Sequence, residues 1–258
     1  MTLVLNEIKQ AKQIIELHQL GDKPSSTLFL LGKYFCQYEN LKQEDIVKSL
    51  NEFMASANDN YNPILWADLI ENISENAHKY PLRQIEHIRI KNSELEKIHS
   101  LNKVKLEKLL FVLLCYAKLH DSVSSTNNGW TNISIPDLFK EARVTVKYKN
   151  DKYLILNDLF QHGYISYSKK NENLNMQINY NIFDDCNSDD NDNDLIIDDF
   201  RELGYCYMNY FSMGDFMNCE RCGILIPKKT NNQHYCKDCG KIVNVEKQKE
   251  RDKKKKKS

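Results

Sequence analysis

Two pairs of cysteines near the carboxyl end of the chain have the spacing of a metal site. Cys219 and Cys222 form one Cys-x-x-Cys pair, and Cys236 and Cys239 form a second pair thirteen residues further on. Four thiolates at this spacing can surround one Zn²⁺ tetrahedrally, because thiolate is a soft anionic ligand that suits zinc. Since sulfur would fill all four positions, none is left for a reactive water, and we expect one structural zinc ion.

Two other interpretations of these cysteines are open. His234 lies two residues before Cys236 and could replace one cysteine as a ligand. The four cysteines could also form disulfides or remain free thiols, although this spacing in a chain that looks cytosolic is more typical of a metal binder. The remaining cysteines are scattered singly, and two of them lie inside apolar helical patterns that predict a place in the core: Cys36 and Cys115.

The segments beside the cysteines must support them and extend them. We predict a zinc-ribbon module over residues 201–243, supported by an aromatic-rich helix or pair of strands between Phe200 and Met217. A basic tail, predicted as a frayed helix or a disordered segment, follows over residues 244–258 and includes Lys253, Lys254 and Lys255. Consecutive lysines attract phosphate without reading base sequence.

The charge of the chain is distributed unevenly. From Arg221 onward there are thirteen Lys or Arg and four Asp or Glu, which gives +9. Because the whole chain of 258 residues has no net charge, the first 220 residues carry −9. Such asymmetry favours contact between the cationic end and nucleic acid or another anionic surface.

The middle of the chain, residues 101–183, resembles winged helix-turn-helix domains in its order of elements. An apolar helix over 101–119 precedes a short strand at 130–133, and a helix capped by Ser134 follows. A third helix is predicted over 152–162 with Leu154, Leu156, Leu159 and Phe160 facing inward. After Gly163 the apolar period changes from 3.6 to 2, which predicts a β-hairpin with strands at 164–168 and 174–182.

The resemblance to winged helices implies that the third helix enters the DNA major groove and that the hairpin touches the backbone. Lysines suit phosphate, and Asn or Gln can read adenine edges. Against this, Asp151 and Asp158 on the same helix would repel phosphate. The matching positions are Lys147, Lys149, Lys152, Asn157, Gln161, Lys169 and Lys170.

Two further segments complete the predicted domain organisation. Residues 1–100 have apolar side chains at helical spacing, which predicts a helical domain. Together with the predicted hairpin, this makes the expected fold class mainly α (α+β). Residues 184–200 form an acidic stretch without a basic residue and predict a solvated linker. Asp190, Asp192 and Asp194 imitate the opening of a calcium loop, but Leu195 and Arg201 occupy the positions where glycine and glutamate are needed.

The Cys-x-x-Cys-Gly sequence, the stretch from Pro227 to Cys236 and the lysine-rich tail resemble the zinc-ribbon termini of uncharacterised proteins from phages and prophages of AT-rich bacteria. The resemblance covers about forty residues and implies no activity. A phage origin implies that the protein works in the cytoplasm of a bacterial host. The start of the chain lacks a signal-peptide pattern, and no apolar window is long enough to cross a membrane.

Three functions follow from these features. The first is a non-enzymatic nucleic-acid-binding protein that acts in transcription or replication, with DNA favoured over RNA. The second is an antagonist that binds a host defence complex or polymerase, much as anti-CRISPR inhibitors do, because an acidic surface can occupy a cationic groove. The third is an enzyme, which the sequence disfavours because it has no phosphate loop, no HExxH and no nucleophile-base pattern.

Overall fold

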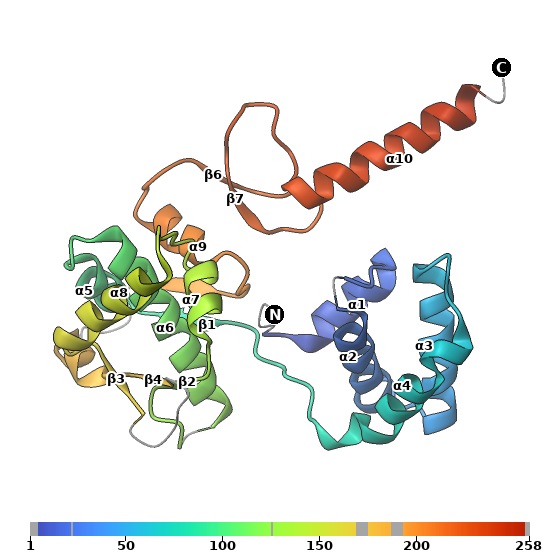
Figure 1. Ribbon diagram of the computed structural model, residues 1–258, viewed down its shortest axis with the longest axis horizontal. Helices are drawn as coiled ribbons and strands as arrows, with labels where there is room; N and C mark the ends of the chain where they lie inside the picture. Colours follow the sequence, from blue (N-terminus) through green and yellow to red (C-terminus); the bar gives the residue numbers. More distant parts are fainter. Residues whose placement is uncertain (1–4, 22, 125, 169–174, 187–192, 256–258) are drawn as a thin grey trace. The chain divides into compact units, whose positions relative to one another are not determined.

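A computed structural model describes residues 5–21, 23–124, 126–168, 175–186 and 193–255. The chain divides into two compact units, residues 4–86 and residues 87–258. We call them the N-terminal unit and the C-terminal unit (Figure 1). The fold is mainly α with small antiparallel sheets, as the sequence predicts. Within the described ranges, every helix is too short or too polar to cross a membrane.

The N-terminal unit is built from helices packed around one apolar cluster. Asn6 and Asn62 cap two of these helices by accepting hydrogen bonds from the amides of Lys9 and Ile64. The buried side chains Leu28, Leu31, Leu50, Met54 and Ile70 come from three helices and form the centre of this core. The elements are α1 (Glu7–Leu17), α2 (Pro24–Gln37), α3 (Gln43–Ala57), α4 (Pro63–Asn76) and the short 3₁₀ helix η1 (Ala77–Lys79).

The C-terminal unit surrounds one buried helix, α6, whose residues from Leu106 to Ala117 are all buried. Its first part comprises β1 (Ile88–Ile90), α5 (Asn92–His99), α6 (Val104–Val123), β2 (Trp130–Thr131), α7 (Ile135–Glu141) and α8 (Lys149–Gln161). Its second part comprises β3 (Ile165–Tyr167), β4 (Met176–Ile178), η2 (Tyr180–Cys186), β5 (Leu195–Ile197), α9 (Leu203–Tyr210), β6 (Phe216–Asn218), β7 (Leu225–Pro227) and α10 (Lys237–Lys255).

The order helix, strand, helix, helix, hairpin is present in α6, β2, α7, α8, β3 and β4. The three strands form one antiparallel sheet in the order β2-β4-β3, with Ile165 opposite Ile178 and Trp130 opposite Gln177. As predicted, Ser134 caps α7 by accepting a hydrogen bond from the amide of Asp137. The element order expected from the sequence therefore matches the structure.

The boundaries differ from the prediction at several places. Of the strand predicted over 174–182, the described residues Met176–Ile178 form β4, whereas Tyr180–Cys186 form the 3₁₀ helix η2. The N-terminal unit ends at Glu86 instead of residue 100, because β1 pairs with β5 and α5 packs against α6. The stretch 184–200 is also not a linker throughout. Its residues Leu195–Ile197 form β5, which pairs with β1 and so joins segments far apart in the chain.

The third helix of the segment 101–183 also differs from the prediction, in its start and in its faces. It begins at Lys149, and Asp151 lies in its first turn, where its carboxylate accepts a hydrogen bond from the amide of Tyr148. Leu156 and Leu159 are buried as predicted. Leu154 and Phe160 are 68% and 41% exposed, so the inward placement predicted for these two side chains is wrong.

Gly204 is required for the packing of α9 in the C-terminal unit. A Cβ atom at this position would lie 2.3 Å from the backbone oxygen of Ala142, and backbone cannot yield as a flexible side chain can. We expect Gly204→Ala to lower the free energy of unfolding by about 1–3 kcal/mol. Tryptophan fluorescence during urea unfolding, in a Trp66→Phe background, reports this unit through Trp130.

Gly240→Ala is the matched control, because its Cβ would lie 4.0 Å from the nearest neighbouring atom, Cβ of Tyr235. This substitution should be neutral or slightly stabilising, since alanine favours a helix over glycine. Equal unfolding midpoints for the two alanine variants would contradict the close approach at Gly204.

Asp194 connects β5 to the start of α5. Its carboxylate accepts hydrogen bonds from the amide of Asn92 at 2.8 Å and from the Arg89 guanidinium. The amide of Asn92 and the guanidinium lower the pKa of Asp194 against the opposing effect of burial. A carboxyl group whose pKa is lower in the folded state stabilises the fold above its unfolded pKa of about 4 and loses that effect as the pH falls through the folded pKa.

Asp194→Asn should therefore destabilise the C-terminal unit by about 0.5–1 kcal/mol at pH 7, a modest value because Arg89 is partly exposed to solvent. The difference from the parent should shrink as the pH is lowered below about 4, where the parent carboxyl becomes protonated. Urea unfolding from pH 7 to pH 3 measures this, and a constant difference across the range would contradict it.

Candidate metal centre

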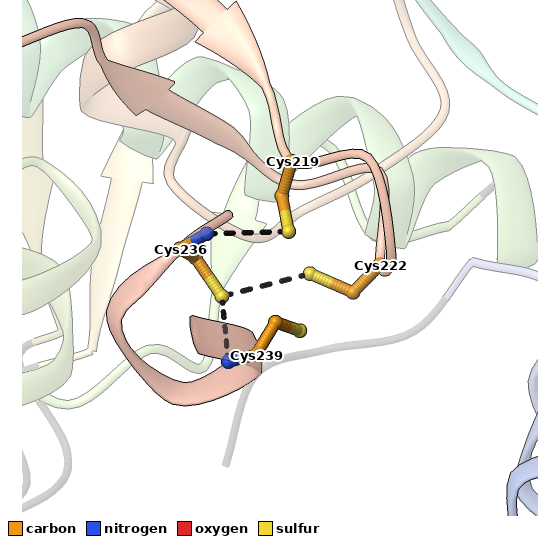
Figure 2. A group of neighbouring side chains, drawn as sticks. All are labelled: Cys219, Cys222, Cys236 and Cys239. Carbon is orange, nitrogen blue, oxygen red and sulfur yellow. Dashed lines mark hydrogen bonds between the residues drawn. The ribbon is translucent and has the colours of Figure 1, made fainter. Parts of the chain in front are cut away.

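The four cysteines meet at one point, although they come from two separate turns. The sulfurs of Cys219, Cys222, Cys236 and Cys239 all lie within 4.8 Å of one another, and Figure 2 shows the four side chains grouped together. The sulfurs of Cys222 and Cys236 are 3.8 Å apart. Four sulfurs at about 2.3 Å from one zinc ion, in a tetrahedron, would be separated by about 3.8 Å. The cluster therefore has the size that a tetrahedral metal ion requires.

The first pair lies in the turn between the antiparallel strands β6 and β7. Met217 faces Ile226 in this ribbon, and the turn closes with hydrogen bonds from Cys219 N to Ile224 O and from Gly223 N to Cys219 O. Gly223 has a φ of +71°, a left-handed conformation that glycine adopts without strain. The short ribbon thus holds Cys219 and Cys222 on one side of the turn.

The second pair lies at the start of α10. Gly240 N donates to Cys236 O at 2.8 Å, which shapes the turn between Cys236 and Cys239. Two backbone amides also point at sulfur: Cys236 N lies 3.2 Å from the sulfur of Cys219, and Cys239 N lies 3.4 Å from the sulfur of Cys236 (Figure 2). Amides directed at sulfur stabilise thiolate ligands.

The electrostatics of the cluster favour binding of a cation. Burial raises the pKa of Cys219, but hydrogen bonds from the amides of Cys236, Cys222 and Arg221 outweigh it and lower this pKa to about 6. Burial raises the pKa of Cys222 and of Cys239, and neighbouring thiols add to the rise. Because thiolates this close repel one another, all four can ionise together only with a positive ion between them.

His234 is not part of the cluster. Its Nδ1 lies 2.6 Å from Glu220 Oε1, and more than half of its side chain is exposed. The group of neighbouring ligand atoms consists of the four cysteines and does not include His234. The structure therefore gives no support to His234 as a ligand. Of the two cysteines predicted to lie in the core, Cys115 is fully buried and Cys36 is partly buried against the apolar cluster of the N-terminal unit.

The cysteine cluster is joined to the rest of the C-terminal unit by polar and aromatic contacts. The Arg201 guanidinium donates to Cys222 O at 2.8 Å and is held by the carboxylate of Asp199. The rings of Tyr205 in α9 and Phe216 in β6 lie 5.6 Å apart. The aromatic-rich stretch expected to support the module therefore contains one helix and one strand that do so.

Helix α10 is tied to the first cysteine turn by an ion pair. The guanidinium of Arg221 donates two hydrogen bonds to the carboxylate of Glu246, at 2.8 Å and 3.0 Å. This pairing lowers the pKa of Glu246 and raises that of Arg221. Sequence analysis did not identify this pair, and a lone arginine inside a Cys-x-x-Cys turn is the only signal that could have suggested it.

The residues predicted to contact nucleic acid fall into three groups. Lys147, Lys149, Asn157 and Gln161 are exposed on or just before α8. Lys152 is only partly exposed, and its ammonium lies 5.2 Å from the centre of the Phe139 ring. Lys253, Lys254 and Lys255 are in the last turn of α10, whereas Lys169 and Lys170 lie outside the described residues.

Comparison with protein-family models, with curated proteins and with solved structures finds no match to this chain.

Cys219→Ser should remove most of the bound metal, because serine is a poor ligand for zinc and three thiolates hold the ion less well than four. Elemental analysis after dialysis should show zinc falling from about one ion per chain to well below one. The far-UV circular dichroism signal should lose the contribution of α10, because Cys239 lies in its first turn and Cys236 directly precedes it.

Cys36→Ser is the matched control, because Cys36 is a free cysteine of the N-terminal unit and not part of the cluster. It should retain zinc at the parent level. Stoichiometric zinc in the Cys219→Ser variant would show that the ion is bound by other residues.

Proposed function

We propose that this chain is a non-enzymatic nucleic-acid-binding protein of a phage or mobile element, with one structural Zn²⁺ held by Cys219, Cys222, Cys236 and Cys239. The observation that supports this proposal best is the position of the cluster at the base of a charged helix. Cys239 lies in the first turn of α10, and Cys236 directly precedes this helix. A bound ion would therefore cross-link the ribbon β6-β7 to that helix, and its role would be structural.

The exposed part of α10 supports contact with an anionic partner. Lys247, Lys249 and Arg251 are all exposed, whereas the nearby Glu246 is paired with Arg221. Within α10 there are eight Lys or Arg and four Asp or Glu, which gives +4. In Figure 1 this helix (red) follows the β6-β7 ribbon (orange) after a connecting loop and is drawn as one unbroken helix. A cationic helix of this kind suits the phosphate backbone of a nucleic acid.

The winged-helix arrangement provides a second surface for the same partner. A helix of such a domain enters the major groove, and lysines at its start can meet phosphates. Lys147 and Lys149 are exposed at the start of α8. Two separate cationic surfaces would raise affinity for a long nucleic acid beyond that of either one. A role in transcription or replication is consistent with this design.

Replacing Lys247, Lys249 and Arg251 together by glutamine should weaken binding to a duplex and flatten its dependence on salt. Each phosphate contact contributes roughly −0.9 to the slope of log K against log salt, so three lost contacts should change the slope by about 2.7. Fluorescence anisotropy with a labelled duplex of about 20 base pairs, at salt concentrations from about 50 to 200 mM, measures the affinity and its dependence on salt.

The matched control replaces three exposed lysines of the N-terminal unit, Lys42, Lys48 and Lys79, by glutamine. The net charge changes equally, but affinity and slope should stay near those of the parent. An unchanged slope in the α10 variant would show that this helix does not contact phosphate. Absence of binding to duplex and single strands by the parent protein would contradict the proposed function itself.

A second candidate function is an antagonist that binds a host protein complex. The observation that favours it is an apolar pair at the start of α4, Ile64 and Leu65, which are 84% and 80% exposed. This pair lies in an acidic unit, since residues 4–86 contain eight Lys or Arg and twelve Asp or Glu. Exposed apolar side chains within an acidic surface suit a partner with a cationic groove.

A further inference from the structure

We propose that helix α8 reads A·T base pairs in the major groove of B-form DNA, through an outward row formed by Asn150, Leu154, Asn157 and Gln161. This inference rests on the proposed nucleic-acid function and names the substrate class of the winged-helix segment. It goes beyond that function because phosphate contacts alone carry no sequence information.

The row is defined by helical geometry and by exposure. Its members are spaced by four, three and four residues, which places them on one face of an α-helix. All four are exposed, and Leu154 is 68% exposed. The opposite face contributes Leu156 and Leu159 to the core, so the rotation of α8 about its axis is fixed. The row spans roughly 16 Å, or about five base pairs.

The side chains of the row match one kind of base pair. Asparagine and glutamine can make paired hydrogen bonds with N6 and N7 of adenine, and an apolar side chain can contact the methyl group of thymine. Guanine is usually read by arginine or lysine, and cytosine by aspartate or glutamate. None of the four residues in the row is charged. The row therefore offers three readers of adenine and one contact for thymine.

The two acids of α8 do not oppose this contact, although the sequence suggested that they would repel phosphate. Asp151 turns back to the helix start, where it accepts a hydrogen bond from the amide of Tyr148. Asp158 is paired with Lys103 at 2.9 Å and lies 3.2 Å from Nδ1 of His162. Both carboxylates are thus engaged within the protein, and Lys103 offsets the charge of Asp158.

The amino-terminal end of the row carries positive charge, which suits the phosphates of a duplex. Lys147 and Lys149 are exposed at the amino-terminal end of α8, next to Asn150. The positive end of the helix dipole lies at the same place, which favours phosphate there. The deep and narrow major groove of double-stranded RNA does not admit side chains to its base edges, so the row selects DNA over RNA.

The test compares binding of the zinc-loaded chain of 258 residues to three labelled duplexes that differ only in a central block of about six base pairs. One block contains A·T pairs, one contains G·C pairs and one contains inosine·cytosine pairs. An inosine·cytosine pair resembles A·T in the minor groove but G·C in the major groove, so it separates the two grooves. We expect binding to the A·T duplex to be at least about tenfold tighter than to either of the others.

Two variants assign that preference to the row. Asn157→Ala combined with Gln161→Ala should reduce the preference for A·T several-fold without changing the slope of affinity against salt. Replacing thymine by uracil in the block removes the methyl group, which should weaken binding of the parent protein but not of Leu154→Ala. Leu65→Ala replaces another exposed leucine, in the N-terminal unit. It is the control and should behave like the parent.

The outcomes separate this inference from the proposed function. Three outcomes would overturn the role of the row and leave nucleic-acid binding intact. The protein could bind all three duplexes equally, or it could bind the A·T and inosine·cytosine duplexes equally. Both variants could also retain the preference for A·T. Failure of the parent protein to bind any DNA or RNA would overturn both. Conversion of an oligomer to a monomer by Leu154→Ala, with no change in DNA preference, would assign Leu154 to a protein contact instead.

Discussion

The close approach of four cysteine sulfurs is the constraint on which the end of this structure depends. The sulfurs of Cys222 and Cys236 lie 3.8 Å apart, a separation at which negative charges cannot accumulate without a cation. The ribbon β6-β7 and the first turn of α10 share no large apolar core with which to hold this arrangement. A bound metal ion would hold the ribbon and the helix together, and its coordination geometry would then fix the direction of α10 relative to the ribbon.

The remainder of the C-terminal unit depends on a different interaction, the burial of α6. Phe111 and Tyr207 pack with ring centres 5.3 Å apart, and the hydroxyl of Tyr207 donates to the buried carboxylate of Glu107 at 3.0 Å. Helix α9, which also contacts strand β6 through Tyr205, is fixed by these contacts. The apolar core and the cysteine cluster are therefore linked through one short helix, and each can influence the position of the other.

Two proposed surfaces for nucleic acid differ in what they can recognise. Helix α10 presents exposed cations such as Lys247 and Lys249, which attract any phosphate backbone. Helix α8 presents amides and one leucine on its outer row, with its acids engaged elsewhere. Charge would bring the duplex to the protein, and the neutral row would discriminate among base pairs. This division explains why the lysine content alone says little about sequence preference.

The sequence by itself determined the features that depend on near neighbours. The Cys-x-x-Cys spacing predicted the cluster, and apolar periodicity with residues such as Ser134 predicted the element order, because turns and amphipathic faces are encoded within a few residues. Only the tertiary structure decided which segments pair across long separations. It placed β5 against β1, moved the unit boundary to Glu86 and turned Leu154 outward, because those outcomes depend on partners far away in the chain.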